Sequence, residues 1–238
     1  MIQRSRRRLA ATMLTLTLAG ALGGCVSLLP KAKPALLYSF GFAQATDAPM
    51  NTMARGVTLA PVEFPREAMG DGILTVEGQQ TSYVAGARWA APATVMFRQA
   101  LDRAFDSAAP GAHLLNRGEP GPSAATLVVD VTRFEADYTD PKAAPTVRIT
   151  LRARLAAPDG SPLDATVFDV SKPAGENRVG AIVAAYDAAT TEALSGLARW
   201  VDQKTPAPVP IRPAPRSTSP SASTKSTTTT STTTTRQP

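Results

Sequence analysis

Residues 146–157, Thr-Val-Arg-Ile-Thr-Leu-Arg-Ala-Arg-Leu-Ala-Ala, show the clearest alternation of apolar and polar side chains in the chain. Every second residue from Val147 to Leu155 is apolar, and each residue between them is Arg or Thr. Successive side chains of a β-strand point to opposite faces of its sheet. The segment is therefore predicted to be a strand of a sheet that is buried on one face and solvated on the other.

The residues on both sides of this strand extend the predicted sheet. Residues 127–138 form a long apolar strand, and prolines in the gap before Thr146 indicate that the two strands make a long hairpin. Pro158-Asp-Gly-Ser161 is a turn sequence, and residues 165–171 supply the next strand. Shorter strands are predicted at four earlier segments, which are residues 35–42, 56–64, 73–77 and 80–84.

Two segments have the spacing of an amphipathic helix. Trp89 begins the first unit, Pro92 suits its first turn, and apolar residues recur at helical spacing until Pro110. The second helix is predicted from residue 178 to about residue 202, with Asn177 as its N-cap. We therefore predict an α+β fold, in which a largely antiparallel or mixed sheet carries two amphipathic helices packed on one face.

The N-terminus has the composition of a secretion signal. Arginines at positions 4, 6, 7 and 8 precede an apolar run of about 14 residues, which is shorter than the roughly 20 residues of a membrane-spanning helix. Leu22-Gly23-Gly24-Cys25 then resembles the bacterial lipobox, in which the thiol receives a diacylglyceryl group and the chain is cut just before the cysteine. Cys25 is the only cysteine, so no intramolecular disulfide is possible. A buried free cysteine after an ordinary signal is the alternative.

The resemblance to a lipobox also implies a location. Val26, rather than Asp, follows the cysteine, which resembles the outer-membrane address of Gram-negative lipoproteins. We expect a palmitate-bearing protein that is anchored to the outer membrane and faces the periplasm. Its predicted parts are a signal peptide (1–24), a tether (25–34), a folded domain (35–202) and a disordered Pro/Ser/Thr-rich tail (203–238).

The basic net charge does not indicate a nucleic-acid partner. The chain of 238 residues has a formal charge of +6, but four arginines lie in the signal and five basic residues lie in the tail. The chain from Cys25 to Asp202 keeps 16 basic residues against 19 acidic ones. A basic footprint on one face, which binding to nucleic acid requires, is therefore not expected.

The sequence offers no constellation of catalytic or cofactor-binding residues. His113 is the only histidine, which excludes a metal site with two histidines. Ser195 lies in a predicted helix and lacks the Gly-x-Ser-x-Gly context of a nucleophile elbow. Asp130, Asp137 and Asp140 lack the spacing of a calcium loop, and no phosphate-cradling loop is present. We expect no catalysis, no cofactor and no metal.

Two sets of side chains are candidate binding groups. Arg148, Arg152 and Arg154 share one strand face, either as a solvated row balanced by Asp130 or Glu135 across the hairpin or as an anion site. Aromatic side chains that could line a groove for a partner or cargo are Tyr38, Tyr83, Trp89, Phe134 and Trp200. Because aromatic residues make up only 5% of the chain, several of the five are expected in the core.

The order of these elements resembles the ABC-type transport auxiliary lipoprotein family, whose best-known branch is the paraquat-inducible protein C type. The resemblance spans residues 25–202 and is carried, with the lipobox, by Ala35-Leu-Leu-Tyr38, Tyr83 through Arg88-Trp89-Ala90, residues 127–134 and residues 184–201. It implies a non-catalytic outer-membrane partner of ABC permease or MCE-domain subunits that move lipids or other hydrophobic molecules. It also implies possible self-assembly into a homo-oligomer. The end of the first strand and the Thr-rich terminus depart from the family pattern.

Two functional hypotheses follow. The first is a transport accessory that acts through contact with permease or MCE-domain subunits. The second is a structural envelope lipoprotein that binds outer-membrane proteins or the cell wall, which the basic Thr/Pro-rich tail favours. Deletion of residues 205–238 is expected to separate them, because only the second hypothesis needs the tail.

Overall fold

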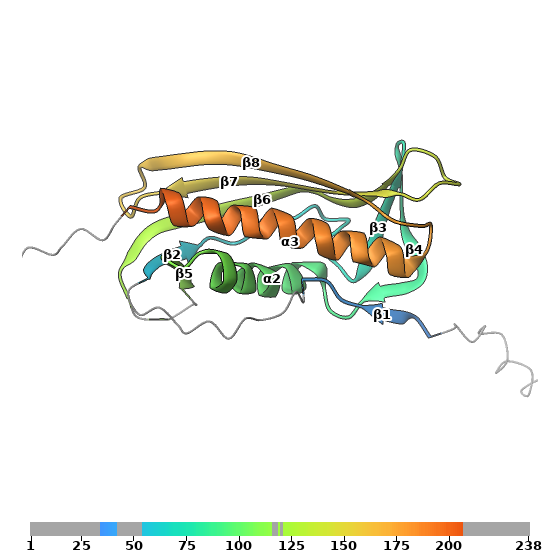
Figure 1. Cartoon of the computed structure of the whole chain (residues 1–238), viewed down its shortest axis with the longest axis horizontal. Coiled ribbons are helices and arrows are strands. Elements are labelled where there is room, and N and C mark those ends of the chain that lie inside the picture. Colours follow the sequence, from blue (N-terminus) through green and yellow to red (C-terminus); the bar gives the residue numbers. More distant parts are fainter. Residues whose placement is uncertain (1–33, 42–53, 116–118, 120, 207–238) are drawn as a thin grey trace, which may run out of the picture. The chain divides into compact units, whose positions relative to one another are not determined.

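The computed structural model describes residues 34–41, 54–115, 119 and 121–206 (Figure 1). The chain divides into two units, Met1–Ala207 and Pro208–Pro238, and all the described residues belong to the first. The expected signal peptide, Cys25 and most of the expected tether and tail lie outside the described residues. Among the described residues, a mixed sheet of eight strands and two helices confirm the predicted α+β class.

One side of the sheet is an antiparallel meander of three long strands. β6 (Ser123–Tyr138) pairs with β7 (Thr146–Ala156), and β7 pairs with β8 (Pro162–Pro173). The predicted long hairpin and the strand after it are therefore confirmed. The alternating apolar residues of β7 are at most 1% exposed, as the pattern predicts; they are Val147, Ile149, Leu151, Ala153 and Leu155.

The other side of β6 is shared by two short groups of strands. β2 (Arg55–Leu59) runs parallel to the first part of β6 and also pairs with β5 (Ala112–Leu115). β3 (Gly72–Glu77) runs parallel to the last part of β6 and pairs with β4 (Gln80–Trp89), and β1 (Leu36–Tyr38) lies parallel to β4. β8 is therefore an edge strand on one side of β6, and β1 and β5 are edge strands on the other side.

Both helices lie on the same face of the sheet, as predicted (Figure 1). α2 (Ala93–Ala108) begins after Pro92, and α3 (Val179–Lys204) crosses the meander. The predicted apolar face of α3 is buried from Ile182 to Val201. Apolar stripes of two helices and one face of the sheet thus form a single core.

An aromatic cluster fills the core between β4, β6 and α3. The ring centroids of Trp89 and Tyr186 are 5.2 Å apart, and those of Phe134 and Tyr186 are 5.1 Å apart. The Tyr186 hydroxyl donates a hydrogen bond of 2.7 Å to the Leu74 carbonyl oxygen of β3. Burial raises the pKa of Tyr186 well above its ordinary value, because the phenolate would lose its hydration.

The segment after β1 is fastened to both helices at Gly41. Gly41 has a φ of 72°, and a Cβ atom there would lie 2.4 Å from the Cβ of Ala100 in α2. The Gly41 N–H donates to Asp187 Oδ1 of α3 at 2.6 Å, and Arg103 Nε of α2 donates to the Gly41 carbonyl oxygen at 2.7 Å. Only glycine fits this crossing, both for its backbone conformation and for its space.

Three details differ from the sequence-based expectations. Trp89 is the last residue of β4 rather than the start of the helical unit, and β5 was not predicted. The N-cap of α3 is Arg178 without a side-chain cap, so the prediction for Asn177 was wrong. The Asn177 side chain instead accepts a hydrogen bond of 2.8 Å from the Tyr138 hydroxyl, which joins the end of β6 to the start of α3.

The end of α3 is held from within the domain by Arg55 of β2. Its guanidinium contacts the Asp202 carboxylate at 2.8 Å and donates to the carbonyl oxygens of Asp202, Gly111 and Thr205. Cations stabilise the C-terminus of a helix because its last carbonyl groups carry partial negative charge. Thr205 is 2% exposed, so the packed domain extends beyond the expected boundary at residue 202.

Candidate functional site

Four large apolar side chains are exposed around β1, β4 and the segment before β3. Leu36 is 65% exposed, Leu37 66%, Met69 45% and Tyr83 54%. Leu36 and Leu37 lie beside Ala87 and Arg88 of β4, and these two β4 residues line an open hollow together with Met69 and Tyr83. We call Leu36, Leu37, Met69 and Tyr83 the N-terminal patch.

The hollow within the N-terminal patch has a volume of about 510 Å³ and lies between residues 66–72 and residues 83–88. An irregular pairing of β3 and β4 creates it, since the register jumps from Leu74↔Tyr83 to Gly72↔Arg88. The extra residues of β4 form a bulge that contains Gly86 in the left-handed conformation, with a φ of 70°. The bulge therefore bends the edge of the sheet at this point.

Tyr83 is held in place although its ring is half exposed. Its hydroxyl donates a hydrogen bond of 2.9 Å to the Glu67 carbonyl oxygen. Its ring lies against Gly72, where a Cβ atom would be 2.5 Å from Tyr83 Cδ1. A glycine at position 72 thus leaves the space that this ring occupies.

The segment before β3 is equally well fixed. The Trp89 N–H donates to the Asp71 carbonyl oxygen at 2.7 Å, and the Ala93 N–H donates to the Gly70 carbonyl oxygen at 2.8 Å. Asp71 also forms an exposed ion pair of 2.8 Å with Arg88 across the hollow. The N-terminal patch is therefore a preformed surface rather than a loose loop.

The five aromatic residues singled out in the sequence do not lie together at one surface. Trp89 is 2% exposed and Phe134 is 1% exposed, so both belong to the aromatic core and present no surface for a partner. Tyr38 and Trp200 are half buried against the core, and Trp200 contacts Phe168 of β8 at a centroid distance of 6.4 Å. Tyr83 is the aromatic residue of the five with the most accessible ring.

The sequence did not predict that Leu36, Leu37 and Met69 belong to an exposed apolar patch, although the two leucines gave a hint. Two leucines, Leu36 and Leu37, lie at the start of the expected domain, one residue after the expected tether. Their exposure depends on the pairing of β1 with β4, which joins segments about fifty residues apart.

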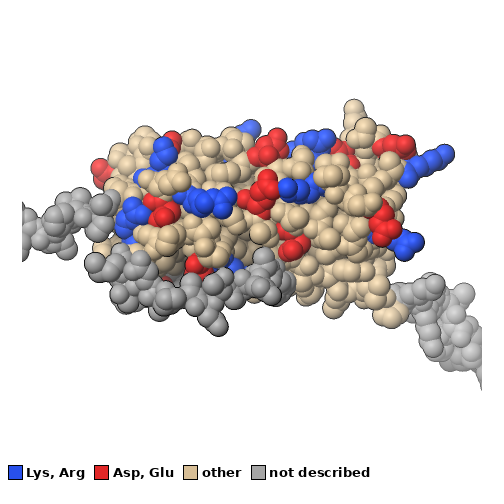
Figure 2. All heavy atoms as spheres, viewed as in Figure 1, with Lys and Arg blue, Asp and Glu red and all other residues tan. Residues whose placement is uncertain are grey.

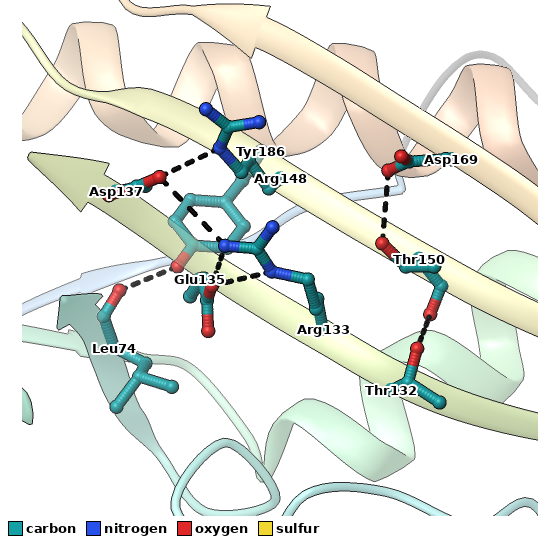
Figure 3. Close-up of polar contacts among 9 residues, drawn as sticks. All are labelled: Leu74, Thr132, Arg133, Glu135, Asp137, Arg148, Thr150, Asp169 and Tyr186. Carbon is teal, nitrogen blue, oxygen red and sulfur yellow. Dashed lines mark hydrogen bonds and ion pairs between the residues drawn. The ribbon is translucent and has the colours of Figure 1, made fainter. Parts of the chain in front are cut away.

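Arg148, one residue of the predicted arginine row, lies on the face of the sheet away from the helices and is paired with an acidic side chain (Figure 3). Arg148 Nε donates to Asp137 Oδ2 at 2.8 Å, and Arg133 Nη2 lies 2.6 Å from Glu135 Oε1. Glu135 thus pairs with its neighbour on β6 rather than across the hairpin. Thr150 extends this polar face toward β8 by donating to Asp169 Oδ1 at 3.0 Å (Figure 3). Arg148 is thus the paired residue of the expected row, and its acidic partner is Asp137 rather than Asp130 or Glu135.

Within the described ranges, no group of three or more His, Cys, Asp or Glu side chains lies close enough together to hold a metal ion. The Nε2 atom of His113 in β5 lies 3.8 Å from Glu119 Oε1, and Ser195 lies within α3. The arrangement that stands out in this part of the chain is a surface for contact, the N-terminal patch.

Among the residues that the structure describes, no helix is both long enough and apolar enough to cross a bilayer.

A family model described as "ABC-type transport auxiliary lipoprotein component" matches residues 38–198. The crystal structure of a Xanthomonas campestris protein of family DUF330 aligns with a TM-score of 0.61 and 26% identity, over 71% of this chain and 96% of that chain. The crystal structure of an uncharacterized protein aligns with a TM-score of 0.56 and 19% identity, over 71% of this chain and 99% of that one, and supports the fold alone. No curated protein sequence matches the chain.

Proposed function

Because the chain belongs to the ABC-type transport auxiliary lipoprotein family, we propose that it is the non-enzymatic outer-membrane component of an ABC/MCE-type system that moves lipids or other hydrophobic molecules across the cell envelope. The observation that carries this proposal is the family match over residues 38–198, which extends from β1 to near the end of α3. A protein of this kind is expected to act by contact with the other subunits of the system.

Attachment to the membrane is the first part of the proposal. Acylation of Cys25 would hold the domain by its N-terminus and would consume the only thiol of the chain. Growth with a clickable fatty acid should label the wild type and leave Cys25→Ala unlabelled. Equal labelling of both proteins would contradict attachment through Cys25. Separation of the inner and outer membranes on a density gradient then tests the proposed outer-membrane address.

Contact with MCE-domain or ABC permease subunits is the second part. Tyr38, Tyr83 and Trp200 remain the candidate contacts for a partner or cargo, because their side chains are at least partly accessible. A photo-crosslinking residue at each position in living cells should capture an MCE-domain or permease subunit from at least one of them. Val95 of α2, which is 45% exposed, provides the matched control position. Failure to capture such a subunit from all three positions would contradict the proposal.

The alternative is a structural envelope lipoprotein that binds outer-membrane proteins or the cell wall through its Thr-rich tail. The structure indicates where the tail deletion that separates the two functions should begin. Removal of residues 205–238 would take away buried Thr205, whose carbonyl oxygen accepts a hydrogen bond from Arg55, and would damage the domain. Deletion of residues 208–238 spares these contacts. A silent deletion favours the transport accessory, and loss of function with an intact domain favours the alternative.

Self-assembly is a further part of the proposal, since it is implied by the family resemblance. Native mass spectrometry of the detergent-solubilised protein should show more than one copy of the chain.

A further inference from the structure

We propose that the N-terminal patch rests on the surface of the lipid bilayer, with Leu36 and Leu37 in the interfacial region between head groups and acyl chains. The inference rests on the proposed function, because it requires that an acylated Cys25 holds the domain at a membrane. It assigns Tyr83, one of the candidate contacts, to the membrane rather than to a protein partner.

The length of chain before β1 is the first support. Ten residues, 26–35, separate Cys25 from Leu36. At about 3.3 Å for each extended residue they span at most about 33 Å, which keeps the start of β1 close to the anchor. Of the exposed apolar side chains in the described part of the chain, Leu36 and Leu37 are the first to follow the anchor.

The geometry of β1 is the second support. Leu36 and Leu37 are neighbours in a strand, so their side chains point to opposite faces of the sheet, and yet both are exposed. The apolar element is therefore the edge of the sheet itself. Within the described residues β1 pairs on one side, with β4, so its outer backbone groups need hydrogen-bond partners. Water and head groups supply them in the interfacial region but not in the hydrocarbon core, which limits the depth of contact.

The chemistry around β1 suits an interface between lipid and water. Tyr83 has an apolar ring and a hydroxyl, a combination that is favoured at the membrane interface. Arg88 and Asp71, which line the same hollow as Tyr83, form an ion pair whose side chains are 56% and 51% exposed, so the charges can stay hydrated. The surface over β1 at the lower right of Figure 2 shows no charged side chain in this view.

The size of the N-terminal patch favours a membrane over a protein partner. A stable protein interface uses roughly 20–30 residues on each side, whereas this patch consists of four apolar side chains, of which Met69 and Tyr83 line one open hollow. A weak contact of this size becomes effective when the anchor already holds the domain at the same surface, because attachment raises the local concentration.

The unique cysteine makes a direct test possible. When acylation consumes Cys25, a cysteine introduced at another position is the one free thiol of the full chain and can carry an environment-sensitive dye. Leu37→Cys reports on the patch. Val167→Cys is the matched control, because Val167 of β8 is 58% exposed and lies at the opposite edge of the sheet. The acylated proteins are reconstituted into vesicles of phosphatidylethanolamine and phosphatidylglycerol that contain a lipid with a nitroxide quencher near the head group.

The expected result is a blue shift and strong quenching of the dye at residue 37, with an aqueous spectrum and little quenching at residue 167. A dye at Met69→Cys should behave like the dye at residue 37 and should lose its quenching when Leu36→Glu and Leu37→Glu are added. Because both positions are exposed, we expect them to accept glutamate without loss of the fold, and circular dichroism checks this.

An aqueous spectrum at residues 37 and 69 on protein that floats with the vesicles would overturn the proposal. A blue-shifted dye spectrum at residues 37 and 69 in native membranes, but not in vesicles of pure lipid, would also overturn the proposal. It would indicate that a protein partner covers the N-terminal patch. Failure of the proposed function has a different signature. The wild type, without an introduced cysteine, would then take up a thiol-reactive dye at Cys25 and would not float.

Discussion

β8 and β1 are both edge strands, but they expose very different edges. β8 has twelve residues, begins and ends at proline, and carries Asp164, Asp169 and Lys172. β1 has three uncharged residues, of which Leu36 and Leu37 are exposed. Prolines and charges discourage the addition of another strand at a sheet edge. The comparison indicates that β8 is protected against pairing, whereas β1 is short and apolar and is suited to contact with a different kind of surface.

The largest expected effect is on stability, and it should differ between β7 and β1 when the same substitution, Leu to Ala, is made in each strand. Leu151→Ala removes a side chain of β7 that is 0% exposed, and it should lower the free energy of unfolding by about 2–5 kcal/mol through lost burial and a cavity. Leu37→Ala removes a side chain that is 66% exposed and should change stability by less than about 0.5 kcal/mol. Urea unfolding of the purified proteins measures both. Comparable losses would mean that β1 is packed like β7.

A smaller loss of stability is expected when the hydrogen bond from Tyr186 of α3 to the Leu74 carbonyl oxygen of β3 is removed. This bond links α3, which covers the meander, to the strands on the β1 side of the sheet. Tyr186→Phe leaves that oxygen without its partner in the core, and it should cost about 1–3 kcal/mol. Hydrogen exchange should rise most in β3 and β4, on the β1 side. Exchange that rises equally in β7 and β8 would show that the bond does not serve the β1 side in particular.

The same substitution should change the dependence of stability on pH. The pKa of Tyr186 is raised above its ordinary value of 10.0 in the folded state, so the stability that it contributes is complete below about pH 10 and is lost as the pH rises toward the raised pKa. The wild type should therefore lose stability above pH 10, and Tyr186→Phe should flatten that loss. Burial also raises the pKa of half-buried Tyr138, so a smaller slope should remain.

The next largest loss of stability is expected at Gly86, in the bulge of β4. Gly86→Ala forces a residue with a Cβ atom into a φ of 70°, which should cost about 1–2 kcal/mol although the space around it is open. Gly180→Ala, in the first turn of α3 and also in open space, is the control and should stabilise the protein by up to about 1 kcal/mol. Thermal unfolding compares them, and a Gly86→Ala protein as stable as the wild type would argue that the bulge is not constrained.

The smallest effect is expected at the rim of the hollow. Arg88→Ala breaks an ion pair whose side chains are 56% and 51% exposed, which should cost between about 0 and 1 kcal/mol. Raising the salt concentration to 1 M shortens the Debye length to about 3 Å, so the difference from the wild type should shrink further. A difference that is large or insensitive to salt would show that Arg88 has a structural role in the hollow.

The meander and α3 could be predicted from the sequence because one rule, burial of one face, acts along their whole length. Residues 146–157 alternate strictly, and the buried residues of α3 recur at helical spacing. The β2–β5 and β1–β4 pairs have no such pattern. β5 has four residues, and its pairing with β2 is parallel and joins distant segments, so local signals do not reveal it. The bulge at Gly86 interrupts the alternation of side chains along β4. The sequence therefore did not indicate that this strand continues to Trp89.

The candidate site was harder to predict for the same reason. Aromatic residue type alone does not tell Trp89 and Phe134, which fill the core, from Tyr83, whose ring lies against Gly72 and is 54% exposed. The N-cap at Asn177 failed because the Tyr138 hydroxyl competes for its side-chain oxygen. Family membership was recognisable from the order of the elements, and the family match over residues 38–198 confirms it.

The crossing at Gly41 has a mechanical consequence. A pull from the N-terminal side would load β1 along its own axis, so that its hydrogen bonds to β4 would be sheared together instead of being unzipped one by one. Behind β1, the contacts of Gly41 with Arg103 and Asp187 pass the load to two helices at once. A load on Gly41 would thus be shared between α2 and α3 instead of resting on β1 alone.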